Sequence, residues 1–149
     1  MKPTRIIVHC TATKNGGEYT VDQLKKDHLA RGFDGIGYHI YIDNYANAYN
    51  TRPLNVPGAH CKGENHDSIG ISMAGTDKFS QQQFNVLRAK IDAVMQLYSI
   101  PAHNLFCHYQ FPSAVAQGKT CPNIPINNLL YWYNTQDEKA ISDWILPKL

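Results

Sequence analysis

The sequence predicts a single α/β domain in which a central mixed β-sheet is flanked by helices. Short runs of branched apolar residues alternate with stretches of helical periodicity that begin at capping residues, and this interleaving is typical of α/β folds. The length of 149 residues suits one domain with its own core, and no repeat or linker divides the chain. We therefore expect residues 1–149 to form one domain with its functional site at a surface cleft.

The first expected elements are a buried strand and a capped helix. Residues 5–10 are mainly apolar and β-branched, and the strand that they predict places His9 at the edge of the sheet, where sites are usually built. Thr20 and Gln23 form a capping box for a helix from about Val21 to Arg31. The glycine that follows this helix is a typical C-terminal stop.

A second strand and its hairpin partner come next. Residues 38–43 alternate along the chain, as a strand does. The alternation predicts two faces, one with Tyr38, Ile40 and Ile42 and the other with His39 and Tyr41. Asp43-Asn44 is a turn signal, so residues 46–51 are expected to return as a short antiparallel strand.

The middle of the chain is expected to form one wall of the cleft. Prolines and glycines interrupt any periodicity between Arg52 and Asp67, so this stretch, which carries His60 and His66, is predicted to be a loop. The strand predicted over 68–73 alternates again. Its core-facing residues are expected to be Ile69, Ile71 and Met73.

The second half of the chain contains the most regular helix. Ser80 and Gln83 form a second capping box, and apolar residues then recur at helical spacing until Pro101. The remaining predicted elements are a short strand over 105–109 that carries His108, an irregular loop over 110–120, and one or two helices over 126–149 that end at Pro147.

The charge balance and hydropathy exclude two classes of partner. A net charge of +2 and a pI near 8.3, with scattered lysines and arginines, do not indicate nucleic-acid binding. No apolar run approaches the roughly 20 residues that span a bilayer, so we expect no membrane insertion and a monomeric soluble protein. The apolar run 6–8 is too short for a secretion signal, which predicts synthesis in the cytoplasm.

The cysteines are expected to be reduced. Four cysteines in a cytoplasmic chain of this length do not form a disulfide framework. Cys10 and Cys107 each stand beside a histidine in a predicted strand, so alternation turns them to the opposite face as buried thiols. Cys61 is not expected to be a nucleophile, because the sequence around it shows neither a helix that would carry it nor a paired histidine that would activate it.

His9, His108 and Cys121 together suggest a catalytic zinc site. Three such ligands leave the fourth tetrahedral position for water, whereas a structural zinc has four protein ligands. Zinc lowers the pKa of its water from about 15.7 to about 7, so a nucleophile is available at neutral pH. Local sequence leaves an alternative open, because each histidine is equally consistent with a buried core residue and the spacing from His108 to Cys121 matches no zinc-finger pattern.

Five co-linear segments carry a family resemblance. They are His9-Cys-Thr-Ala-Thr13, Gly37-Tyr-His-Ile-Tyr-Ile42, His60-Cys-Lys-Gly-Glu-Asn-His-Asp-Ser-Ile-Gly70, the Ser- and Gln-rich helix that follows, and His108 with Lys119-Thr-Cys-Pro122. Over about residues 5–133 they resemble the zinc-dependent N-acetylmuramoyl-L-alanine amidases of the amidase-2 family. This family includes phage amidase-type lysozymes and peptidoglycan recognition proteins.

The resemblance implies hydrolysis of the amide between the lactyl group of N-acetylmuramic acid and L-alanine in peptidoglycan. It implies one zinc ion at His9, His108 and Cys121, catalytic assistance from Tyr38 and Lys119, and a place for His60 in the substrate groove. A cation such as Lys119 can stabilise the charge that develops on the carbonyl oxygen, and Tyr38 can hydrogen-bond the zinc-bound water or protonate the leaving nitrogen. Their local alternatives are a solvated loop lysine, a core tyrosine and, for His60, an exposed loop histidine.

Two functions of different class are compatible with this resemblance. The favoured one is a zinc amidase, either an endolysin that reaches the cell wall after holin-assisted release or a bacterial cell-wall remodelling or recycling enzyme. The alternative is a non-catalytic module that binds muropeptide. The cysteine ligand, Cys121, favours catalysis. Some phage lysozymes also inhibit the phage RNA polymerase through an N-terminal arm, but only about four residues precede the first strand here, so this activity is not expected. The tail, about residues 134–149, lies outside the resemblance.

Overall fold

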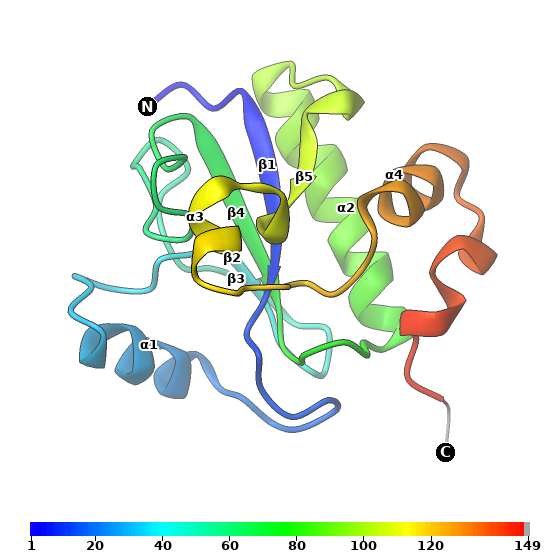
Figure 1. Cartoon of the computed structure of the whole chain (residues 1–149), viewed down its shortest axis with the longest axis horizontal. Coiled ribbons are helices and arrows are strands. Elements are labelled where there is room, and N and C mark those ends of the chain that lie inside the picture. The colour runs from blue at the N-terminus through cyan, green and yellow to red at the C-terminus, as the bar shows by residue number, and fades with distance from the viewer. Residues whose placement is uncertain (148–149) are drawn as a thin grey trace.

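The computed structural model describes residues 1–147 and is organised around a mixed sheet with the strand order β3-β2-β4-β1-β5 (Figure 1). The strands are β1 (Arg5–Cys10), β2 (Ile40–Ile42), β3 (Ala48–Asn50), β4 (Ser68–Met73) and β5 (Leu105–Cys107). Only β3 runs antiparallel to its neighbour, which confirms the predicted hairpin. The two central strands, β1 and β4, are buried almost throughout, so the sheet is covered on both faces.

Helices cover the two faces unequally. The larger core lies on the face covered by α2 (Gln81–Tyr98) and α4 (Ile126–Thr135). Its helical side chains include Phe84, Leu87, Ile91, Leu129 and Trp132, and its strand side chains include Ile69, Ile71 and Met73, as predicted. A smaller cluster on the other face holds α1 (Val21–Ala30) through Leu24. His9 points to this second face, because Val8 and Cys10 on either side of it belong to the larger core.

Both predicted capping boxes are present, which explains where α1 and α2 begin. The Gln23 N–H donates to Thr20 Oγ1 at 3.1 Å, and the Thr20 N–H donates to Gln23 Oε1 at 2.8 Å. Ser80 and Gln83 make the same two hydrogen bonds at 3.0 and 2.8 Å. These local interactions satisfy N–H groups that have no partner within the helix.

The strand predicted over 38–43 is shorter than expected, and Tyr38 lies outside it. The Ala59 N–H donates to Gly37 O at 3.0 Å, and a Cβ on Gly37 would lie 2.1 Å from Ala59 O. This close approach of two loops holds the chain away from strand geometry just before β2. As a result Tyr38 packs with Tyr41, and the prediction that it shares a face with Ile40 and Ile42 is wrong.

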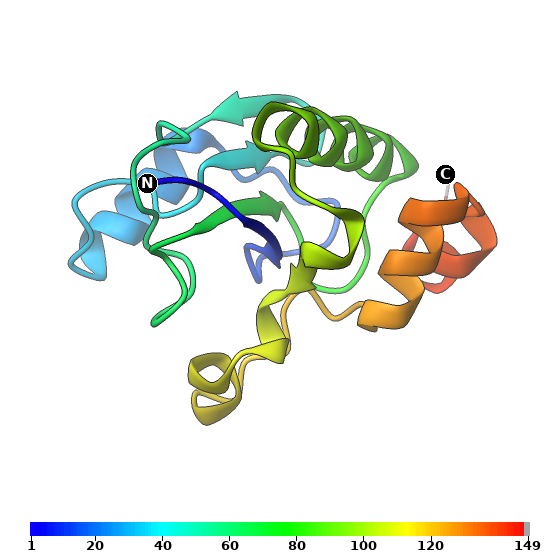
Figure 2. The same ribbon diagram turned by 90° about the horizontal axis from the view of Figure 1, so that it is seen from above.

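Two predictions near residue 110 also need correction. The strand expected over 105–109 ends at Cys107, and His108 begins a 3-10 turn, His108–Gln110, in which Gln110 Oε1 accepts the Cys107 N–H at 2.8 Å. The expected irregular loop contains the helix α3 (Pro112–Ala116), which begins with proline at a position where its missing N–H is not needed. Figure 2 shows α3 and the loop after it projecting from the body of the domain.

The tail closes one end of the larger core. It contains α4 and the 3-10 helix η3 (Glu138–Trp144), as the sequence predicted, and these lie together in Figure 2. Ile141 is fully buried, and the Leu146 N–H donates to Phe79 O at 2.8 Å, so the tail packs beside the start of α2. The helical pattern ends at Trp144, ahead of Pro147. A further 3-10 turn, η1 (Ala102–Asn104), precedes β5.

Within residues 1–147, the helices are too short or too polar to cross a membrane.

Candidate metal centre

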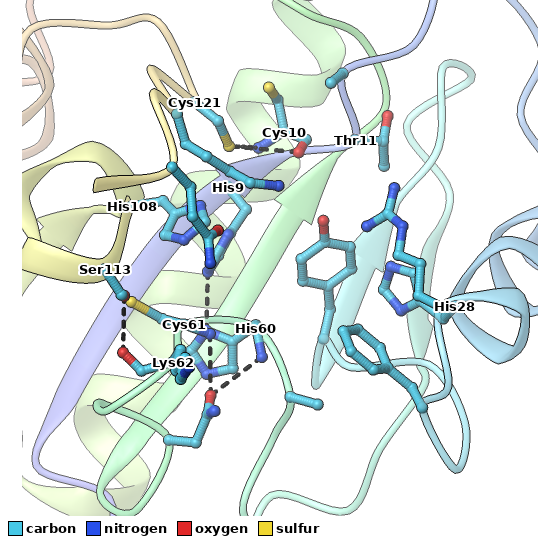
Figure 3. A pocket seen from close by; sticks show the side chains of 18 of the residues that line it. His9, Cys10, Thr11, His28, His60, Cys61, Lys62, His108, Ser113 and Cys121 are labelled. Carbon is cyan, nitrogen blue, oxygen red and sulfur yellow. Dashed lines mark hydrogen bonds between the residues drawn. The ribbon is translucent and has the colours of Figure 1, made fainter. Parts of the chain in front are cut away.

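Three side chains from distant parts of the chain meet at the carboxyl ends of β1 and β5. These strands pair in parallel, with Val8 opposite Cys107, so the next residues, His9 and His108, come together with ring centroids 4.3 Å apart. Cys121 reaches them from the loop after α3 (Figure 3). One possible ligand atom from each of His9, His108 and Cys121 lies within 4.8 Å of the other two. The predicted ligand set is therefore assembled in space.

Backbone hydrogen bonds hold Cys121 at this place. Its Sγ accepts the Cys10 N–H at 2.8 Å (Figure 3). Its carbonyl accepts the Tyr109 N–H at 3.1 Å. The first bond ties the sulfur to the end of β1, and the second ties the loop to the turn that carries His108. The thiol of Cys10 itself packs in the larger core, and Cys107 is also a buried free thiol, as predicted.

The electrostatic environment keeps the two imidazoles neutral. Burial, assisted by the neighbouring His60 and His108, lowers the pKa of His9 well below its usual value. Burial and the Lys119 charge lower the pKa of His108 to about 4. Hydrogen bonding to Cys10, together with burial, raises the pKa of the Cys121 thiol in the metal-free protein. A neutral imidazole is the form that binds a metal, whereas the thiol must lose its proton on binding.

His60 is buried rather than exposed, and it contacts a candidate ligand. Its Nδ1 lies 2.8 Å from His9 Nε2 and its Nε2 lies 3.2 Å from Ser68 Oγ. Because Ser68 Oγ donates to Glu64 O at 2.6 Å, it accepts from His60 Nε2. His60 Nδ1 is then the acceptor for the His9 Nε2–H, which leaves His9 Nδ1 free for a metal. A hydrogen bond of this kind orients a metal ligand and fixes its tautomer.

A glycine makes this histidine contact possible. A Cβ on Gly70 of β4 would lie 2.6 Å from His60 Cγ, so the His60 ring occupies the space that a side chain on the strand would fill. The loop itself is held by Asn65, whose Oδ1 accepts the N–H groups of His60 and Cys61 at 3.1 and 3.0 Å (Figure 3). Residues 59–63 and Asn65 line the groove that holds the candidate ligands, so the prediction that the loop 52–67 forms a wall of the cleft is confirmed for this part of it.

The candidate ligands lie in a groove of about 450 Å³. Tyr38 and Lys119, the two residues that the resemblance links to catalysis, both line it. The centroid of the Tyr38 ring lies 5.2 Å from that of the His9 ring. Lys119 is exposed, and its charge lies close enough to lower the pKa values of His9 and His108. Burial raises the pKa of the Tyr38 phenol, an increase that the nearby Ser72 hydroxyl opposes.

The charge of the groove is one-sided. Its lining contains three cationic side chains, Arg31, Lys62 and Lys119, and, among the residues that the structure describes, no carboxylate. A groove of this charge favours an anionic ligand and disfavours a cationic one.

Comparison with known proteins identifies the family. The model of a family described as N-acetylmuramoyl-L-alanine amidase matches residues 1–124. The chain belongs to this family. The endolysin of Escherichia phage T7 is 32% identical to it over 146 residues, which cover 93% of this chain and 89% of the relative.

Solved structures agree with this placement of the amidase. It is similar to the N-acetylmuramoyl-L-alanine amidase LysC from Clostridium intestinale URNW, with a TM-score of 0.77, 30% identity and coverage of 89% of this chain and 86% of the other. It is also similar to peptidoglycan recognition protein-LE in complex with tracheal cytotoxin, a monomeric diaminopimelic acid-type peptidoglycan, with a TM-score of 0.69 and 25% identity over 82% and 75% of the two chains.

The groove of the amidase contains residues that sequence reasoning did not assign to it. His28 of α1 and Arg31, the C-cap residue of α1, both line it, and their spacing of three is a signal that could have indicated a shared role. His28 is buried, and its Nδ1 accepts the Gly37 N–H at 2.9 Å, so it has a structural role between α1 and the loop before β2. The other unassigned histidines lie outside the groove: His39 is buried and hydrogen-bonded, while His66 and His103 are exposed.

We expect the metal-free amidase to lose stability as the pH falls from about 6.5 towards 4. Burial and the Arg31 charge lower the pKa of His28 from 6.5 to about 4, so the unfolded chain binds the extra proton first. Stability is therefore complete above the unfolded pKa and declines below it, because unfolding is then coupled to proton uptake. For His28 alone the loss approaches about 3 kcal/mol at pH 4.

The variant His28→Asn tests this expectation. Its amide oxygen can still accept the Gly37 N–H, but it does not titrate. Urea unfolding with a chelator present, from pH 7 to pH 4, should show a shallower decline in the free energy of unfolding for the variant. Equal declines in the two proteins would show that His28 does not titrate in this range.

Proposed function

We propose that this N-acetylmuramoyl-L-alanine amidase uses one zinc ion, held by His9, His108 and Cys121, and acts as an endolysin. The bond that it cleaves joins the lactyl group of N-acetylmuramic acid to L-alanine in peptidoglycan. The observation that carries the proposal is the meeting of three donor atoms within 4.8 Å in the groove of a member of this family.

The donor set fits catalytic zinc. Two neutral imidazoles and one thiol are ligands that zinc accepts, and three of them leave one coordination position free, as in catalytic rather than structural sites. A zinc ion bound here supplies a Lewis acid for the substrate carbonyl and lowers the pKa of water to about 7. The His60 contact orients His9 for this purpose, so His60 supports a ligand as well as lining the groove.

Lys119 and Tyr38 have complementary tasks in amide hydrolysis. Negative charge develops on the carbonyl oxygen as the amide is attacked, and the Lys119 ammonium on the groove wall stabilises it. The leaving nitrogen must gain a proton before the C–N bond breaks. A tyrosine phenol, with an ordinary pKa of about 10, holds its proton at neutral pH, and Tyr38 donates a hydrogen bond or proton to that nitrogen.

The charge of the groove supports a peptidoglycan substrate. Peptide stems carry carboxylates. These match the groove lining, which has three cationic side chains and, among the described residues, no carboxylate. The complex of peptidoglycan recognition protein-LE with a monomeric peptidoglycan supports binding of muropeptides to this fold. Endolysin relatives support cell-wall lysis as the biological role. Cytoplasmic synthesis followed by holin-assisted release stays a prediction.

Removal of the metal is expected to abolish peptide release. Purified peptidoglycan is incubated with the zinc-loaded protein and with protein treated with a chelator, and the soluble products are identified by mass spectrometry. Free stem peptides that begin with L-alanine should appear only with the zinc-loaded protein, and adding zinc back should restore them.

The same experiment separates the enzyme from a binding module. Retention of the protein on peptidoglycan without release of peptides would support the non-catalytic alternative. Release that continues unchanged after chelation would contradict the zinc assignment while leaving the amidase activity in place. The retained thiol ligand, Cys121, favours the enzyme, because a module that only binds has no need of it.

A further inference from the structure

Ser72 lies near the proposed reaction centre, and its buried hydroxyl lacks a hydrogen-bond partner among the described residues. It lies on β4 with no exposed surface, and its Oγ makes no hydrogen bond to the atoms of residues 1–147. Burying a hydroxyl without a partner costs free energy, and nearly all buried polar groups in proteins have one. An unpaired hydroxyl at this place is therefore a candidate for a functional role.

The register of the sheet shows where the Ser72 side chain points. Ser72 is opposite His9 on β1 and Tyr41 on β2, and paired residues of parallel strands turn their side chains to the same face. Its neighbours Ile71 and Met73 belong to the core on the other face. Ser72 therefore points to the face that carries the groove.

Tyr38 is the side chain to which the Ser72 hydroxyl can hydrogen-bond. The Tyr38 ring is held between His9 and His28, with centroid distances of 5.2 Å to each, so its position is set by packing. The Ser72 hydroxyl interacts with the Tyr38 phenol, but Ser72 Oγ has no partner at normal hydrogen-bond geometry among the described residues.

We propose that Ser72 is a positioning residue for Tyr38: with substrate in the groove, the Ser72 hydroxyl donates a hydrogen bond to the phenol oxygen and directs the phenol O–H at the scissile amide. A phenol that accepts one hydrogen bond becomes a better donor of its own, because hydrogen bonds in a chain polarise one another. The inference rests on the proposed function, since it assigns the proton of Tyr38 to the reaction. It adds a residue that acts only through Tyr38.

The variant Ser72→Ala should change stability and rate in opposite directions. Loss of an unpaired buried hydroxyl should raise the melting temperature by a few degrees. Loss of the hydrogen bond to Tyr38 should lower kcat about tenfold, with KM and bound zinc unchanged. A purely structural serine would not combine higher stability with lower kcat.

Ser68 provides a matched control for the stability effect. It lies on the same face of β4 and is equally buried, but its hydroxyl donates to Glu64 O at 2.6 Å. The melting temperature should therefore fall in Ser68→Ala and rise in Ser72→Ala. A fall in both would show that the Ser72 hydroxyl has a partner in solution, such as water, and would overturn the proposal.

The dependence on Tyr38 is tested with double variants. In a Tyr38→Phe background, Ser72→Ala should cause no further loss of kcat, and an undiminished tenfold loss would overturn the proposal. If the Tyr38→Phe rate is too low to measure, Ser72→Thr decides, because it keeps the hydroxyl and should be faster than Ser72→Ala. An equal or slower rate for Ser72→Thr would overturn the positioning role.

Failure of this inference can be distinguished from failure of the proposed function. Absence of peptide release from the unmodified amidase would contradict the proposed function. A loss of kcat in Ser72→Ala that is indifferent to Tyr38 would contradict only the pairing of these two residues.

Discussion

Replacing Cys121 by alanine is expected to leave the amidase without bound zinc and to reduce peptide release by at least about a thousandfold, to the level of the chelated protein. Cys121 is the one thiol among the three donors, and the other two donors alone are a poor zinc site. The measurement is zinc per protein by elemental analysis, followed by product analysis on peptidoglycan. Far-ultraviolet circular dichroism of the variant should match that of the parent, because Cys121 lies in a surface loop.

Cys61→Ala is the matched control for this variant. Cys61 is also a free cysteine that lines the groove, but it is not among the residues whose possible ligand atoms meet. Cys61→Ala should therefore bind a full equivalent of zinc. Loss of zinc from Cys61→Ala, with zinc retained by Cys121→Ala, would show that our proposal assigns the metal to the wrong cysteine.

The variant Lys119→Ala is expected to bind zinc as the parent does but to have a much lower kcat. The lysine is not a donor to the metal, and its backbone N–H still donates to Ala114 O at 2.8 Å in the variant, so the loop that carries Cys121 should retain its conformation. Loss of one group that stabilises the developing oxyanion typically costs about a hundred- to a thousandfold in kcat. Zinc content and kcat, measured on the same preparation, test this expectation.

Lys62→Ala separates this local effect from the general charge of the groove. Lys62 contributes the same charge to the lining, from the loop after β3. Its removal should raise KM for an anionic muropeptide with little effect on kcat, whereas Lys119→Ala should act mainly on kcat. If the two variants lost kcat equally, the role of Lys119 would be electrostatic attraction of the substrate rather than stabilisation of the transition state.

Local interactions explain why much of the fold could be predicted. The capping boxes at Thr20 and Ser80 are satisfied within four residues of chain, so the starts of α1 and α2 follow from sequence alone. Buried strands such as β4 are also evident, because their branched apolar residues form short uninterrupted or alternating runs. The errors fall where distant segments touch, as at Gly37, whose contact with Ala59 removes Tyr38 from the expected strand.

For the candidate site too, some features could be predicted from sequence and others only from the structure. The residue types of His9, His108 and Cys121 suggest zinc, and the family resemblance adds Tyr38, Lys119 and His60. The hydrogen bond from His9 to His60 could not be predicted, because it depends on the space above Gly70, on a strand adjacent to β1. The unpaired Ser72 hydroxyl is likewise invisible in sequence, since a serine in a strand is ordinarily either solvated or hydrogen-bonded.

The amino-acid sequence by itself therefore determined the elements, the chemistry of the donors and the kind of reaction that they suit. Only the tertiary structure decided that two imidazoles and a thiol converge in one groove and that a third imidazole orients the first. It also decided that Ser72 lies unpaired opposite His9 on the neighbouring strand. The physical reason is that strand register and loop contact arise from pairing of segments about a hundred residues apart, such as β1 with β5. No local pattern encodes that pairing.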